Sequence, residues 1–145
     1  MALRADRHDY SRAFEKHYKA YCAWNSSGHL ESQSIILFYC VECGLKFLLM
    51  RKLKLYKTKD ANQSISNILK SHDLINLLKE LHQNRFSFQK IKTKHDEDVS
   101  LTEYHQMRRY CIEVKSEKYN EIRKQYDENL RSVAQWIYEE RWAKQ

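Results

Sequence analysis

Histidine and arginine side chains that could move a proton and hold a phosphate stand together in the segment "YHQMRRY". His105 and Arg109 are four residues apart, with Arg108 beside Arg109, so on a helix His105 and Arg109 share one face. A histidine can remove the proton of a ribose 2′-hydroxyl, and an arginine can stabilise the charge that develops on the phosphate. These three residues are the candidate catalytic group for RNA cleavage without a metal. The alternative is a solvated helix face that carries a histidine.

A second polar group, Ser-His-Asp, opens the segment "SHDLINLLKEL", in which four leucines follow helical spacing. Ser71 is a good N-cap, and Asp73 places negative charge at the positive end of the helix dipole. The pattern predicts a helix from about Ser71 to His82 and indicates that His72 and Asp73 serve to begin it.

Other spacings that suggest chemistry are weaker. In "RAFEKH", Arg12 and His17 form a weaker alternative catalytic pair, one that arises easily by chance in a chain with 7 histidines. Cys40 and Cys43 could begin a zinc site, but no second pair supplies the other two ligands, so core packing is favoured. The run "HDED" lacks the alternating geometry of a calcium loop. No metal and no cofactor is expected.

Positive charge is concentrated in the first half of the chain. The net charge is +7; residues 1–71 carry 12 Lys and Arg against 6 Asp and Glu, whereas residues 72–145 carry 14 against 13. Two stretches, 46–59 and 85–94, hold cations and no acid. Cations interleaved with aromatic rings suit single-stranded RNA. The predicted RNA-binding residues are Arg51, Lys52, Lys54, Lys57, Lys59, Arg85, Phe86, Phe88, Lys90, Lys92 and Lys94.

The first basic stretch has an alternative explanation. Arg51, Lys52 and Lys54 would also be favourable simply as cations at the end of a helix. The two stretches flank the predicted 71–82 helix and therefore lie near its opposite ends. A continuous patch would require the loop 84–99 to fold back, or a dimer to bring two copies together.

Composition predicts one all-α domain over residues 1–145. The chain has no proline and two glycines, too few turn residues for a β-sandwich or barrel. Hydrophobic periodicity predicts helices over about 6–24, 30–53, 71–82, 100–114 and 118–142, with the second at the centre of the bundle. Residues 54–70 are expected to connect helices with at most one turn, and 84–99 to form a loop with a weak strand signal. "SLTE" at Ser100 is a capping box; nothing marks a break between the last two helices.

No apolar run approaches the length of a membrane span, and the first ten residues lack the apolar core of a signal peptide. A cytoplasmic protein without a membrane partner is expected, with its four cysteines reduced.

Three stretches, taken in order, resemble the HEPN family of small helical bundles. "YCVECGLKFLLM" is similar to the family's A-x-E-x-x-L-K-x-L-L helix through Glu42 and Lys46, "SHDLINLL" to its HDL helix start, and "YHQMRRY" to the aromatic-x-x-x-R-Y start of its fourth helix. The resemblance implies a homodimer that binds RNA or cleaves it without a metal. It also implies that His72 and Asp73 line the cleft near the arginines of "MRRY", where the aspartate would hold the guanidinium groups.

The chain departs from the nuclease members of that family at one important point. Those members carry an arginine, four to six residues, and then a histidine, but the positions counted from Arg108 or Arg109 hold Glu, Val, Lys and Ser. The sequence therefore predicts an RNA-binding, HEPN-like protein, with metal-independent endoribonuclease activity as its catalytic form. The alternative is a non-catalytic interaction module that pairs with a nucleotidyltransferase or toxin partner.

Overall fold

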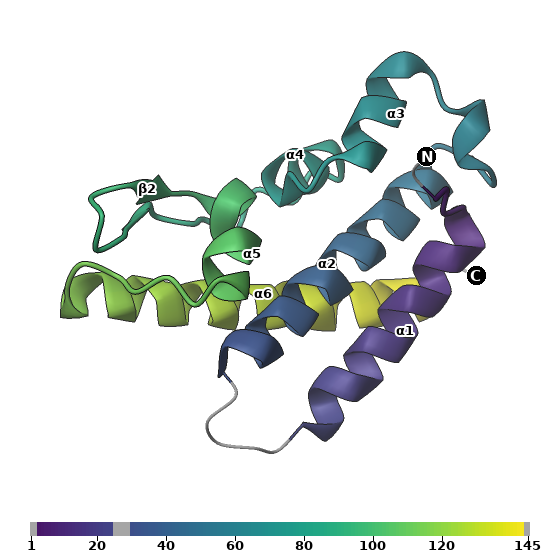
Figure 1. Ribbon diagram of the computed structural model, residues 1–145. Helices are drawn as coiled ribbons and strands as arrows, with labels where there is room; N and C mark the ends of the chain where they lie inside the picture. Colours follow the sequence, from purple (N-terminus) through teal and green to yellow (C-terminus); the bar gives the residue numbers. More distant parts are fainter. Residues whose placement is uncertain (1–2, 25–29, 144–145) are drawn as a thin grey trace.

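A computed structural model describes residues 3–24 and 30–143 and shows a helical bundle with one small hairpin (Figure 1). The predicted all-α class is confirmed. The elements are α1 (Arg7–Ala23), α2 (Leu30–Lys52), the 3₁₀ turn η1 (Thr58–Asp60), α3 (Gln63–Lys70), α4 (Leu74–Glu80), β1 (Ile91–Lys92), β2 (Asp98–Val99), α5 (Leu101–Arg109) and α6 (Glu117–Ala143). Helices α1 and α2 lie side by side, and α6 crosses behind them.

Helix α2 forms the core, as its nearly continuous apolar sequence predicts. Most of its side chains from Leu37 to Met50 are buried against α1, α5 and α6. At Gly44 the helices approach so closely that a Cβ atom would lie 2.7 Å from Ile137 of α6 and 2.7 Å from Phe14 of α1. Glycine therefore permits this crossing, and a larger residue would force the three helices apart.

By length and composition alone, α2 could also cross a membrane. Among the described residues the segment Glu31–Lys52 meets that test, but 67% of its apolar window is buried inside the bundle. The core helix of a bundle can be as long and as apolar as a membrane-spanning helix.

The predicted helix at 71–82 begins later than expected. Ser71 instead ends α3, and its hydroxyl donates to the carbonyl of Ile68 (2.9 Å). Asp73 is the N-cap of α4 and accepts from the amide of Asn76 (3.1 Å). The assignment of Ser71 as N-cap was wrong because the carboxylate of Asp73 offers both an acceptor and a negative charge to the first turn. In the connection 54–70, α3 lies where one turn was expected, at about Ser64 to Leu69, and η1 is an additional turn that was not predicted.

Helices α5 and α6 are separate, and α5 ends at Arg109, earlier than the predicted 114. Cys111 adopts a left-handed conformation (φ 52°), which lets the amide of Ile112 donate to the carbonyl of Met107 (3.0 Å) and closes the helix end. The predicted capping box at Ser100 is present: its amide donates to the carboxylate of Glu103 (2.9 Å). The strand pairing lies at 91–92 and 98–99, beyond Phe86 and Phe88.

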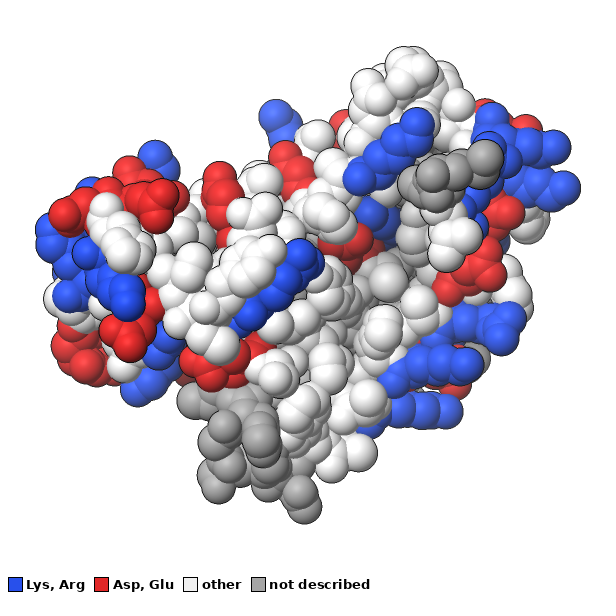
Figure 2. Space-filling model, viewed as in Figure 1, with Lys and Arg blue, Asp and Glu red and all other residues white. Residues whose placement is uncertain are grey.

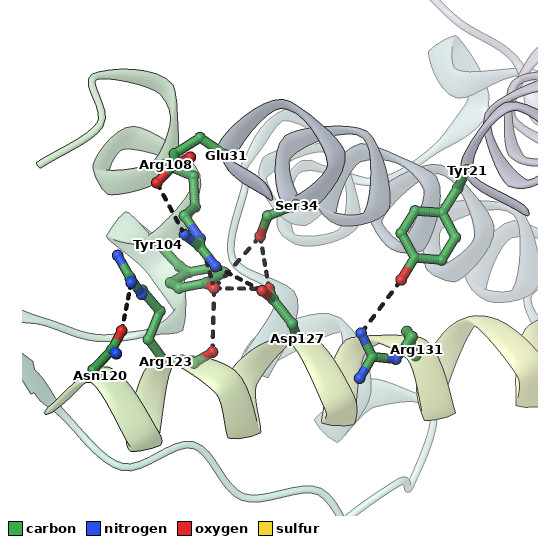
Figure 3. A network of polar contacts seen from close by, with 9 residues as sticks. All are labelled: Tyr21, Glu31, Ser34, Tyr104, Arg108, Asn120, Arg123, Asp127 and Arg131. Atoms are coloured by element: carbon green, nitrogen blue, oxygen red, sulfur yellow. Dashed lines mark hydrogen bonds and ion pairs between the residues drawn. The ribbon is translucent and has the colours of Figure 1, made fainter. Parts of the chain in front are cut away.

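A buried polar network joins α2, α5 and α6 (Figure 3). Arg108 donates to the carboxylate of Asp127 (2.6 Å) and to the hydroxyl of Tyr104 (2.9 Å). The other carboxylate oxygen of Asp127 accepts from Tyr104 (2.7 Å) and from Ser34 (2.6 Å). Glu31 lies 3.7 Å from the guanidinium. Because Arg108 is only 4% exposed, Asp127 supplies the charge that makes its burial tolerable.

We predict that Asp127→Ala lowers the free energy of unfolding by about 3 to 5 kcal/mol, because it removes the carboxylate that pairs directly with the buried Arg108 and leaves only Glu31, 3.7 Å away. The matched control is Glu121→Ala on the same helix, whose ion pair with Lys124 (3.3 Å) is exposed; we expect its effect to stay within about 0.5 kcal/mol. Urea denaturation measures both. Equal effects of the two substitutions would show that the network contributes no more than a surface pair.

Candidate acid–base site

A buried carboxylate on α2 anchors the candidate site. Glu42 is 8% exposed and lies among apolar side chains of the core helix. Lys46, one turn later and 5% exposed, donates to it (3.0 Å). The other carboxylate oxygen lies 2.8 Å from Nδ1 of His72. Two partners therefore compensate the burial of this charge.

His72 combines this buried partner with exposure to solvent. It lies in the short connection between α3 and α4, and 51% of its side chain is exposed. When the imidazole is neutral, a hydrogen bond to an ionised Glu42 places the proton on Nδ1 and leaves the lone pair on Nε2. Nε2 has no hydrogen-bond partner among the described residues, so it is available as a proton acceptor. This is the arrangement by which a carboxylate orients a general base.

His105 lies directly behind His72. Their ring centroids are 4.9 Å apart, and the centroid of the Phe38 ring lies 5.0 Å from that of His105. Burial, together with the positive charges of His72 and Arg109, lowers the pKa of His105 below its usual value of 6.5. The predicted catalytic histidine is therefore a buried ring whose charged form is disfavoured, and not part of a solvated helix face.

The two predicted arginines point to different places. Arg108 is occupied by Asp127 in the buried network. Arg109 is exposed; it donates to the hydroxyl of Tyr39 and lies over the ring of Tyr110, 5.9 Å from its centroid. The prediction that Asp73 holds these arginines was wrong, because Asp73 is committed to capping α4. Of these two arginines, Arg109 is the one that solvent and an anionic ligand can reach.

The first basic stretch is partly used to bind helix ends. Arg51 donates to the carbonyls of Glu140 (3.1 Å) and Arg141 (3.4 Å) near the end of α6. Lys52 donates to the carbonyl of Glu80 at the end of α4 (2.8 Å). Four cations of this stretch are exposed, at the end of α2 or in and next to η1. They are Lys52, Lys54, Lys57 and Lys59.

The second basic stretch is mostly paired as well. Lys92 lies 3.3 Å from Asp98, and Lys94 lies 3.9 Å from Glu113. The two phenylalanines are half-buried: Arg85 covers the ring of Phe86, and Phe88 packs against Tyr126. Lys90 is exposed. In Figure 2 blue side chains gather around η1 and along α1, whereas the hairpin end carries both signs of charge.

The remaining predicted residues lie outside this site. Arg12 is exposed and His17 half-buried on α1, and among the described residues they make no hydrogen bond or ion pair with the Glu42–His72 group. Burial raises the pKa of Cys40, and it raises that of Cys43 to about 11, as expected for core packing. Within the described residues no group of three or more His, Cys, Asp or Glu is placed to hold a metal ion.

Sequence reasoning missed Glu42 as the partner of His72. The signal was present: an acidic residue interrupts the most apolar segment of the chain, with Lys46 four residues later. A carboxylate that must be buried requires a charged or hydrogen-bonding partner. The pairing itself spans 30 residues and depends on where α4 begins.

Comparison with protein-family models, with curated proteins and with solved structures found no match.

We predict that His105 makes the protein less stable in acid. Because its pKa is lowered by folding, the unfolded chain binds a proton near pH 6.5 that the folded chain resists, so the free energy of unfolding falls as the pH drops below that value. In His105→Leu this part of the decline should disappear, as measured by urea denaturation between about pH 7 and pH 5.

The control is Phe38→Leu, which disturbs the same ring cluster without removing a titrating group. It should lower stability at every pH and keep the wild-type pH dependence. An unchanged pH dependence in His105→Leu would contradict the prediction.

Proposed function

We propose that this protein binds RNA and cleaves it without a metal ion, with His72 as the acid–base residue. One observation carries the proposal: a half-exposed imidazole is hydrogen-bonded through Nδ1 to a buried carboxylate at 2.8 Å. A buried carboxylate holds such a ring in one orientation and stabilises its protonated form. The HEPN resemblance of the same residues, Glu42 and the "HDL" segment, supports the same assignment.

The chemistry needs one base and one cation. Nε2 of His72 removes the proton of a ribose 2′-hydroxyl, and the 2′-oxygen attacks the adjacent phosphorus. The bond to the 5′-oxygen breaks, leaving a 2′,3′-cyclic phosphate and a 5′-hydroxyl whose proton comes from solvent. His72 then returns its proton to water. Arg109 stabilises the negative charge that develops on the phosphoryl oxygens.

His105 and Arg108 receive other roles in this proposal. His105 supports the ring of His72 by packing, since it is buried and its pKa is lowered. Arg108 fixes α5 against α6 and so sets the position of Arg109. The exposed cations near η1 supply non-specific attraction for the RNA backbone.

The second candidate function is a non-catalytic module that pairs with a nucleotidyltransferase or toxin, as a homodimer or in a mixed complex. The observation that favours it is the missing histidine after Arg109, at positions 113–116. Intact RNA after incubation with pure protein would support this second function.

We predict that the pure protein cleaves labelled RNA in the presence of EDTA and leaves 2′,3′-cyclic phosphate ends. His72→Gln should reduce the rate by about 100-fold or more, because it removes the base. Arg109→Ala should reduce it by about 100-fold through loss of charge stabilisation. His105→Phe keeps a buried ring and should retain most of the activity.

His17→Gln is the matched control, a histidine outside the site on α1. Circular dichroism and thermal melts check that each variant is folded at the assay temperature. Activity lost in His17→Gln and kept in His72→Gln would move the site to α1 and overturn the proposal. Loss of activity only on treatment with EDTA would overturn its metal-independent chemistry.

A further inference from the structure

Tyr110 is an exposed aromatic residue whose ring does not pack against the core. Its backbone forms the C-cap of α5, and the residue is 66% exposed. No other aromatic ring of the described residues packs against it, whereas the exposed Tyr138 lies against Tyr18. The exposed Tyr56 likewise lies under an arginine, Arg7. The one ring contact of Tyr110 is with the guanidinium of Arg109, at 5.9 Å.

A continuous series of contacts joins Tyr110 to the acid–base site. The ring of His72 lies against that of His105 (4.9 Å), and His105 lies 6.5 Å from the ring of Tyr39. The hydroxyl of Tyr39 accepts from Arg109, which in turn covers Tyr110. The exposed members of the series are His72, Arg109 and Tyr110.

The order of these residues matches the parts around one phosphodiester, namely the 2′-hydroxyl of one nucleotide, the phosphate, and the base of the next nucleotide. A base can stack on an exposed aromatic ring, a guanidinium can hold the phosphate, and an imidazole can act on the sugar hydroxyl. The far side of the Tyr110 ring, away from Arg109, is the face that a base could cover. A base paired in a duplex cannot reach such a ring without leaving its stack.

We infer that Tyr110 and Arg109 form a nucleotide subsite, in which an unpaired base next to the cleaved phosphate stacks on Tyr110. The inference rests on the proposed function, because the base that stacks on Tyr110 is the base next to the phosphate at which cleavage is proposed. Stacking on an aromatic ring tolerates any base, so the subsite selects for an unpaired nucleotide and not for a sequence.

The test uses binding, so that it does not depend on cleavage. The His72→Gln protein is titrated with a short single-stranded RNA that carries 2-aminopurine, whose fluorescence is quenched on stacking, while anisotropy gives the Kd. We expect the fluorescence of the bound RNA to be quenched. When Tyr110→Ala is added to His72→Gln, we expect the quenching to be lost and the RNA to bind about 10-fold more weakly. Tyr110→Phe should retain both, and the control Tyr138→Ala, an exposed tyrosine of α6, should change neither.

A second comparison isolates the base itself. The 2-aminopurine is replaced by an abasic nucleotide at each position in turn. At the position that stacks, removing the base and removing the Tyr110 ring should weaken binding by the same factor, and the two changes together should weaken it no further.

The outcomes separate the two proposals. RNA binding with Kd unchanged in Tyr110→Ala, or additive effects at every abasic position, would overturn the subsite and leave the proposed function standing. Equal affinity for a duplex of the same sequence would also overturn the subsite. No RNA binding by the His72→Gln protein would overturn both.

Discussion

The burial of α2 is the constraint on which the rest of the structure depends. A helix surrounded by other elements cannot leave a polar side chain unpaired, because an uncompensated buried charge costs several kcal/mol. The buried polar residues Ser34 and Glu42 therefore need partners, and each has one outside α2. Ser34 requires Asp127 of α6, and Glu42 requires Lys46 and His72. The need to pair buried polar side chains therefore shapes both the core and the candidate site.

Helix α5 connects these two parts. Its residues Tyr104 and Arg108 are four apart and face the buried network with Asp127. His105 and Arg109 are also four apart, and lie about 100° further round the helix. The ion pair that fixes the rotation of α5 therefore also places His105 behind His72 and Arg109 at the surface. Along this nine-residue helix, the two residues of the buried network therefore alternate with the two residues of the candidate site.

Local sequence patterns predicted the structural features that depend on residues close together in the chain. They gave the all-α class, the central position of α2, the capping box at Ser100 and the shared face of His105 and Arg109. Pairings between distant elements could not be predicted in this way. The partner of Arg108 lies 19 residues away and that of His72 lies 30 residues away, and neither spacing has a periodicity that indicates contact. The N-cap of α4 was mispredicted because two acceptors, Ser71 and Asp73, stand two residues apart, and Asp73 alone also brings a negative charge to the first turn.

The tautomer of His72 tests the central claim most directly. If Glu42 orients this imidazole for proton transfer, the neutral ring carries its proton on Nδ1 and its lone pair on Nε2. Two-bond ¹⁵N–¹H correlation spectra of the ¹⁵N-labelled protein at a pH where the ring is neutral distinguish the two nitrogens, and His72→Gln assigns the signal. We predict a protonated Nδ1 in the wild type, and a shift toward the other tautomer in Glu42→Leu. A wild-type His72 protonated on Nε2 would contradict the account.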